Sequence, residues 1–194
     1  WYNKYEAKEE MKIAVFMGGT SSEKEISLRS GEAVLESLQR QGYDAYGVVL
    51  DENNQVTAFL ENDYDLAYLV LHGGNGENGK IQAVLDILGK KYTGSGVLAS
   101  ALTMDKNKTK QIAENIGIRV PKSYRDLDSI ERFPVIIKPV DEGSSKGLFL
   151  CNNKEEAGEA LKKLRKPIIE DYIVGEELTV GVLNGKALGV LKII

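Results

Sequence analysis

The residues of this chain best suited to chemistry are Lys138 and the Gly/Ser segment that follows it. Residues 134–139 form a short, β-branched apolar run, which predicts a buried strand ending in a lysine. A cationic amine at the edge of a core costs free energy unless an anion meets it. Residues 142–147 predict a turn whose backbone N–H groups and hydroxyls, those of Ser144 and Ser145, converge on phosphate oxygens. The pair predicts a nucleoside triphosphate site; the alternative is a hairpin whose lysine reaches into solvent.

The first half of the chain is expected to alternate strands with helices. Strand-like runs occupy residues 12–17, 45–50 and 66–71, and residues 80–88 have helical spacing. This order predicts a parallel sheet covered by helices on both faces. Ligands bind such sheets at the carboxyl ends of the strands, so the Gly-Gly pairs after residues 17 and 72 should share one rim.

The first helix is expected to begin after Ser22 and to end at Gly42. Ser22 and Glu25 have the spacing of a capping box. Apolar residues at helical spacing predict the buried face of this helix: Ile26, Ala33, Val34 and Leu38.

A different pattern starts near residue 104. A helix is predicted over 106–115, a hairpin joins the strand of Lys138 to residues 148–151, and a helix over 154–164 precedes a strand over 168–170. Asn184-Gly185 is a strong signal for a two-residue hairpin turn between strands over 177–183 and 186–194. Strands joined by turns predict an antiparallel α+β unit. Met11 is expected to be the native start, and residues 1–10 a tag or a frayed arm.

Composition narrows the class of protein. The 194 residues are 42% hydrophobic and 28% charged, as in ordinary globular proteins. A net charge of −4 argues against nucleic-acid partners and a membrane-binding basic patch, and no apolar run is long enough to span a bilayer. The single cysteine, Cys151, fits a reducing cytoplasm. With His72 as the only histidine, a multi-histidine metal site is excluded.

Four blocks follow one another along the chain: residues 18–27, 72–82, 92–106 and 134–147. Together they resemble the D-alanine–D-alanine ligases, an ATP-grasp family of bacterial cell-wall synthesis. The resemblance extends over residues 11–194 and departs from the family at Asn78, where an aspartate is common. It implies an N-terminal Rossmann-like domain over 11–105, an α+β ATP-grasp central domain over 106–176 and the start of a truncated C-terminal ATP-grasp domain over 177–194.

The resemblance implies ATP-dependent ligation of two D-alanines through an acyl phosphate, for peptidoglycan synthesis. Glu23 matches the family's glutamate for the ammonium of the first D-alanine, and His72 matches the histidine beside that substrate. Ser144 matches the loop serine that links this glutamate to a tyrosine. Structural alternatives exist: a first-turn acid also favours the helix dipole, and a lone histidine is often structural.

The resemblance also implies an ATP site. Lys106 and Lys138 match the lysines that contact ATP phosphates, which the loop with Ser144 and Ser145 would cover. The adenine-side and ribose-side positions match Glu170, Tyr172, Ile173 and Glu177, although the two glutamates also suit solvated strand ends.

Mg²⁺ is the implied metal cofactor, with its ligands in the family's last domain and none assigned to this chain. The implied partners are D-alanine, ATP and a second copy of the chain in a homodimer, in the cytoplasm. Two alternatives stay open: a D-alanine–D-lactate ligase, and an inactive nucleotide-binding fragment.

Overall fold

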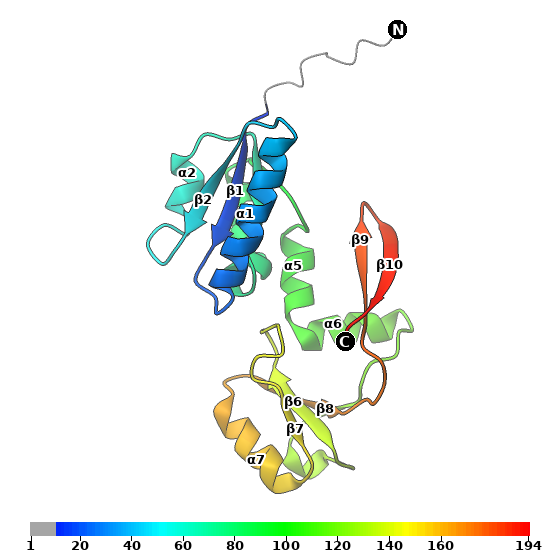
Figure 1. The fold of residues 1–194 in the computed structure, drawn as a ribbon. Coiled ribbons are helices and arrows are strands. Elements are labelled where there is room, and N and C mark those ends of the chain that lie inside the picture. The colour runs from blue at the N-terminus through cyan, green and yellow to red at the C-terminus, as the bar shows by residue number, and fades with distance from the viewer. Residues whose placement is uncertain (1–10) are drawn as a thin grey trace. The chain divides into compact units, whose positions relative to one another are not determined.

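The computed structural model describes residues 11–194, and the expected arm over 1–10 lies outside them (Figure 1). Contacts divide the chain into two units. One comprises the chain up to Arg119 together with Pro139–Lys146, and the other comprises Val120–Lys138 and Gly147–Ile194. The domain bounds at 105 and 176 do not coincide with this division and stay a prediction.

The first unit is built on a parallel sheet with strand order β2-β1-β3-β4. Its strands are β1 (Ile13–Gly18), β2 (Ala45–Leu50), β3 (Leu66–Leu69) and β4 (Lys91–Tyr92). β1 pairs in parallel with both β2 and β3, and β3 with β4. The predicted parallel sheet is confirmed. β1 is an inner strand of this sheet, and all residues of β1 are therefore buried.

Helices connect these strands or follow the last of them. They are α1 (Lys24–Arg40), α2 (Thr57–Glu61), α3 (Gly74–Glu77), α4 (Lys80–Ile87), α5 (Val97–Met104) and α6 (Lys106–Asn115). The helices predicted over 80–88 and 106–115 are therefore confirmed within a residue, whereas α2, α3 and α5 were not anticipated.

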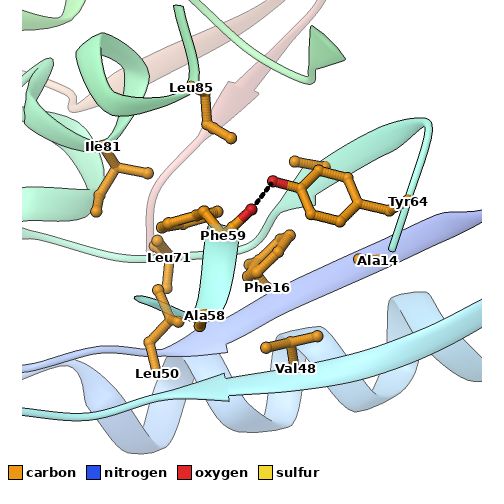
Figure 2. Packing of buried hydrophobic residues seen from close by; sticks show 11 residues of the cluster. Ala14, Phe16, Val48, Leu50, Ala58, Phe59, Tyr64, Leu71, Ile81 and Leu85 are labelled. Atoms are coloured by element: carbon orange, nitrogen blue, oxygen red, sulfur yellow. Dashed lines mark hydrogen bonds between the residues drawn. The ribbon is translucent and has the colours of Figure 1, made fainter. Parts of the chain in front are cut away.

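Two apolar clusters lie on opposite faces of this sheet, since side chains alternate along β1. Val15 and Met17 pack against α1, and Phe16 packs on the other face against α2 and α4. Phe16 and Phe59 have ring centroids 4.3 Å apart, and the Tyr64 hydroxyl donates to the Phe59 carbonyl (Figure 2). Burial raises the pKa of Tyr64 to about 12. Helices thus cover both faces, as expected.

The details predicted for α1 are partly wrong. Its N-cap residue is Glu23, without a side-chain capping bond, so Ser22 and Glu25 form no capping box. Its buried positions are Ser27 and Gly31, whereas Ile26 and Ala33 are exposed. A Cβ on Gly31 would lie 2.5 Å from the Met17 Cβ, so this glycine lets α1 approach β1 closely. The predicted positions Val34 and Leu38 do pack against the core, so the predicted apolar face is confirmed in part.

The second unit contains a sheet with strand order β5-β8-β6-β7. Its elements are β5 (Ser123–Tyr124), a 3-10 helix η1 (Leu127–Ser129), β6 (Val135–Pro139), β7 (Phe149–Cys151), α7 (Lys154–Lys163) and β8 (Pro167–Asp171). β5 pairs antiparallel with β8, and β6 with β7, as the turn-linked pattern predicts. Val135 and Ile137 are fully buried against α7 residues, so the predicted buried strand before Lys138 is confirmed.

A separate hairpin pairs β9 (Leu178–Leu183) with β10 (Lys186–Lys192) in antiparallel register. Asn184 and Gly185 have φ of 49° and 75°, the left-handed conformation that the Asn-Gly turn predicts. Among the described residues, no helix is both long and apolar enough to cross a membrane.

Candidate functional site

The carboxyl ends of β1 and β3 form the rim on which the first candidate site lies. These strands are direct neighbours in the sheet, and the chain leaves them through Gly18-Gly19 and His72-Gly73. A pocket at this rim is lined by Gly18, Gly19, Thr20, Ser21, Leu50, Gln55, Leu71, His72, Gly73, Asn75, Gly76 and Ile81. The expectation that both glycine pairs share one rim is therefore confirmed.

Ser21 ties the two loops of the rim together. Its hydroxyl donates to the His72 carbonyl at 2.5 Å and accepts from the Glu23 backbone N–H at 3.1 Å. The start of α1 is thereby fixed beside the segment that follows β3. Ser21 was not among the sequence candidates; a serine directly after a glycine pair at a strand end is the signal that could have found it.

Glu23 lies at the centre of this arrangement. The Ser144 hydroxyl donates to Glu23 Oε1 at 2.5 Å, across 121 positions of sequence. The other carboxylate oxygen faces Gly73, where an added Cβ would lie 2.7 Å from Glu23 Oε2. Gly73 has φ of 65°, so both its backbone and its missing side chain make room for the carboxylate. Glu23 and Ser144, predicted to act together, are in direct contact.

The Gly/Ser loop is held against α1 at a second point. The Lys146 ammonium donates to the Ser22 carbonyl at 2.6 Å. Ser144 and Ser145 have φ of 52° and 55°, a left-handed conformation that costs a non-glycine residue about 1–2 kcal/mol. The contacts of Ser144 and Lys146 offset this cost. Ser145 is exposed next to them.

His72 presents one unsatisfied ring nitrogen. Its Nε2 is buried and has no hydrogen-bond partner in the part of the chain that the structure describes. Its Nδ1 lies 4.0 Å from Glu77 Oε1, and Glu77 Oε2 accepts from the Gly73 N–H at 2.9 Å. A buried nitrogen without a partner costs free energy, so His72 is poised for a polar ligand.

Lys106 lies at the base of the Gly/Ser loop. Its backbone N–H donates to the Val140 carbonyl at 3.0 Å, and its ammonium donates to the carbonyls of Val140 and Glu142. The Lys106 charge therefore lies beside the loop that was predicted to cover phosphates.

Lys138, in the second unit, pairs with Glu170. The carboxylate side chain of Glu170 is 5% exposed and the side chain of Lys138 is 25% exposed. β6 and β8 are neighbours in the sheet, and this places the two charges together. Two sequence candidates are thus joined by a contact that was not predicted.

Two further residues predicted on the adenine side, Tyr172 and Ile173, follow Glu170 after one intervening residue. Tyr172 and Ile173 are exposed at the end of β8, and the Tyr172 N–H is 3.4 Å from the Pro134 carbonyl. Glu177 has an exposed side chain, and its carbonyl accepts from the Ile193 N–H at 2.9 Å. Within residues 11–194, no hydrogen bond or ion pair joins Glu177 to another candidate residue.

A buried polar cluster that sequence reasoning missed adjoins these residues. Asp171 accepts from the Tyr124 hydroxyl at 2.7 Å and from Arg132 Nη2 at 2.5 Å. The hydrogen bond from Arg132, followed by that from Tyr124, lowers the pKa of Asp171 below its ordinary value. Asp171 anchors β8 immediately before Tyr172. The only sequence signal was an acid inside an apolar strand.

Comparisons with known proteins agree with the predicted resemblance. The family model described as D-ala D-ala ligase C-terminus matches residues 91–194, and the model described as D-ala D-ala ligase N-terminus matches residues 12–60 and 54–95. The chain belongs to the D-alanine–D-alanine ligase family.

Similar proteins carry the same description. The chain is 87% identical, over 184 residues, to a D-alanine–D-alanine ligase of Fusobacterium nucleatum, covering 95% of this chain and 64% of that protein. A ligase of Aquifex aeolicus is 41% identical, covering 95% of this chain and 67% of that one. The chain thus spans about two thirds of the length of these relatives.

Solved structures support the fold. A D-alanine–D-alanine ligase of Bacillus anthracis matches with a TM-score of 0.85 and 34% identity, covering 94% of this chain and 64% of that chain. The same protein complexed with ATP matches with a TM-score of 0.83 and 33% identity, covering 94% of this chain and 66% of that chain. The α/β fold class with its ATP-grasp relatives is confirmed.

Proposed function

We propose that this chain supplies the first D-alanine site and part of the ATP site of an ATP-dependent D-alanine–D-alanine ligase. The observation that carries the proposal is the hydrogen bond from Ser144 to Glu23, which holds a carboxylate against Gly73, a residue that lines the rim pocket together with His72. A fixed carboxylate suits the ammonium group of an amino acid, since a charge-assisted hydrogen bond is stronger than a neutral one.

The proposed roles are those that the family resemblance implies. Glu23 accepts hydrogen bonds from the ammonium of D-alanine, and the Nε2 of His72 offers a further polar contact. Lys106 and Lys138 bind ATP phosphates and neutralise charge that develops on the transferred phosphoryl group. Tyr172 and Ile173 contact the adenine, Ser145 caps the phosphates and Glu177 binds the ribose. The D-alanine carboxylate is phosphorylated, and the amine of a second D-alanine displaces phosphate from the acyl phosphate.

Mg²⁺ is proposed to accompany ATP. The residues that the structure describes contain no group of three or more His, Cys, Asp or Glu able to hold a metal ion. They do not fit a magnesium site, so no ligand and no step are assigned to the ion here.

The relatives named above are D-alanine–D-alanine ligases, which favours D-alanine over D-lactate as second substrate. Peptidoglycan synthesis, a cytoplasmic location and a homodimer are part of the same proposal. Cys151, free and buried, suits a reducing compartment.

The direct test is a titration of the 194-residue chain with D-alanine. His72 is its only histidine, so the ring proton signals report on the rim without overlap. We expect a saturable shift with D-alanine, none with L-alanine, and loss of the response in Glu23→Gln. Glu25→Gln, an exposed acid of the same helix, is the matched control. A wild-type response that survives Glu23→Gln would contradict the proposal.

A further inference from the structure

The ladder of backbone hydrogen bonds between β1 and β3 is interrupted at the rim, where the two strands end. Phe16 is paired with Leu69, and the next bond runs from the Val70 N–H to the Phe16 carbonyl at 2.9 Å. In a regular parallel ladder the following bond would run from the Gly18 N–H to the Val70 carbonyl. No such backbone bond is present within residues 11–194.

The hydroxyl of Ser27 takes the place of that bond. Ser27 Oγ accepts from the Gly18 N–H at 2.8 Å and donates to the Val70 carbonyl at 2.5 Å. Ser27 lies on the buried face of α1 and is 0% exposed. An oxygen atom from a helix is therefore inserted between two neighbouring strands, where they lead into the pocket.

Hydrogen-bond satisfaction alone does not require this serine. The Gly18 N–H and the Val70 carbonyl are complementary groups of adjacent strands and could bond directly. In the structure the two groups are joined through Ser27 Oγ and not directly. The loops of the rim carry Gly19 on one side and His72 on the other, and both line the pocket.

We propose that Ser27 is a positioning residue for the amino-acid ligand: its hydroxyl is a spacer that holds the carboxyl ends of β1 and β3 apart and so sets the distance between the loops that carry Gly19 and His72. The inference rests on the proposed function for its ligand, D-alanine. Ser27 does not line the pocket itself, and it acts through Gly18 and Val70.

The test compares the full 194-residue chain with Ser27→Ala, and uses Ser30→Ala on the same helix as control. The first measurement is the NMR scalar coupling across hydrogen bonds between the Gly18 nitrogen and the Val70 carbonyl carbon. We expect no coupling in the wild type and in Ser30→Ala. In Ser27→Ala we expect the coupling to appear, together with a shift of the His72 ring signals, because the strands close on each other.

The second measurement is ligand affinity. Closure of the two strands in Ser27→Ala should weaken D-alanine binding by about tenfold or more, which corresponds to the loss of about one hydrogen bond. ATP-induced shifts at Tyr172, in the other unit, should keep their wild-type midpoint. If Ser27 only stabilised the fold, Ser27→Ala would lower the stability of the chain but would not weaken D-alanine binding while leaving ATP binding unchanged.

If Ser27→Ala fails to fold, Ser27→Cys takes its place. A thiol fills the same position but is a weak hydrogen-bonding group, so we expect an open rim and nearly normal D-alanine binding. Wild-type D-alanine affinity in Ser27→Ala, absence of the Gly18–Val70 coupling there, or a closed rim in Ser27→Cys would each overturn the spacer role. If the wild type does not respond to D-alanine, the proposed function is overturned. The spacer role of Ser27 is still tested in that case by the Gly18–Val70 coupling in Ser27→Ala.

Discussion

Glu23 has two carboxylate oxygens with different surroundings. One accepts from the Ser144 hydroxyl, and the other lies where a Cβ on Gly73 would be 2.7 Å away. Ser144 therefore orients a charge and does not neutralise it. In this respect the pair differs from Lys138–Glu170, in which a cation compensates a buried carboxylate.

A double-mutant cycle tests the first pair. In a chain completed to the length of the relatives, Glu23→Gln and Ser144→Ala should each raise the KM for D-alanine, and the double variant should be less impaired than the sum of the two effects. Hydrogen bonds to charged groups contribute roughly 1.5–3 kcal/mol, so each change is expected to cost about ten- to hundredfold. Glu25→Gln, an exposed acid in the first turn of α1 with no assigned role, is the control. Strictly additive effects would show that the two side chains do not cooperate.

Replacing Lys138 is expected to have two effects, one on ATP use and one on stability, which can be measured separately. Lys138→Ala should weaken ATP use about ten- to hundredfold, because charge-assisted contacts to phosphate are lost. It should also destabilise the second unit, by up to about 3–5 kcal/mol, since the buried carboxylate of Glu170 loses the ammonium group of Lys138 as an ion-pair partner.

The double variant Lys138→Ala/Glu170→Gln distinguishes these effects. Urea unfolding should show that stability is largely recovered, while steady-state kinetics should show that ATP use is not. If Lys138→Ala unfolds at the wild-type urea concentration, the ion pair contributes nothing to stability.

At the residue scale, the sequence predicted which residues belong to the candidate site better than it predicted which side chains contact one another. The motif resemblance identified Glu23 and Ser144 as partners, and they are in contact. Periodicity could not identify Ser27, because a serine on a helix gives no apolar signal; only the fold shows that it faces β1. Long-range polar contacts such as Tyr124–Asp171 have no local signature in the chain.

At the scale of elements, close packing of α1 on β1 depends on Gly31. Gly31→Ala would place its Cβ 2.5 Å from the Met17 Cβ, which cannot move without the strand. Overpacking of this kind costs about 1–3 kcal/mol, more than the gain in helix propensity of up to about 1 kcal/mol.

Gly158→Ala in α7 is the matched control, because its Cβ would lie 3.7 Å from Leu127 Cδ1, an ordinary contact. We expect this variant to be more stable than wild type by about 0.5–1 kcal/mol. Chemical denaturation of both variants measures the difference. An increase in stability for Gly31→Ala would mean that α1 is not held against β1 as described.

The Asp171 cluster makes the second unit sensitive to acid. Arg132 and Tyr124 lower the pKa of Asp171 in the folded state, so near that pKa the unfolded chain binds more protons than the folded one. The stabilisation is therefore fully present above the ordinary pKa of aspartate, about 3.9, and is lost as the pH falls through the lower folded value.

Asp171→Asn should remove this dependence. Urea midpoints of the second unit measured between neutral pH and acid should fall less steeply for Asp171→Asn than for wild type. Asp128→Asn, an exposed carboxylate paired with Lys154, serves as control. Parallel acid limbs for wild type and Asp171→Asn would exclude a role of this cluster in acid stability.

Element positions were predictable where one local signal dominated. β2 and α6 match their expected ranges, and Asn184-Gly185 forms the turn. The expected capping box failed because Ser21, not Ser22, is drawn to the His72 carbonyl and to the Glu23 N–H. The expected apolar face of α1 is right at Val34 and Leu38, which pack against the core, and wrong at Ile26 and Ala33, which are exposed. Ser27 and Gly31 lie at the sheet instead, where space is limiting.

At the scale of the molecule, the two units draw on separate cores. The clusters around Phe16 and Val15 belong to the first unit, and the cluster around Ile137 belongs to the second. The β9–β10 hairpin has only exposed residues, and an isolated two-stranded hairpin is marginally stable. Its exposed apolar residues include Leu178, Val180, Val182, Leu188, Val190 and Leu191. This end of the chain gains little stability from burial within residues 11–194.

The division into two units leads to different expectations for D-alanine binding and for catalytic turnover. The rim with Glu23 and His72 lies wholly within the first unit, so D-alanine binding should persist in the 194-residue chain. Phosphoryl transfer depends on cations that neutralise the developing charge, and Lys106 and Lys138 are only part of what such a site uses.

We therefore expect no D-alanine-dependent phosphate release when the 194-residue chain is incubated with ATP and Mg²⁺. The chain spans 64% of the Fusobacterium nucleatum relative, and a chain completed to that length should release phosphate only when D-alanine is present. The completed chain with Lys138→Ala is the control for contaminating ATPases, because its D-alanine-dependent release should fall about ten- to hundredfold. Release that depends on D-alanine in the 194-residue chain would show that the residues described here suffice for the phosphoryl transfer step.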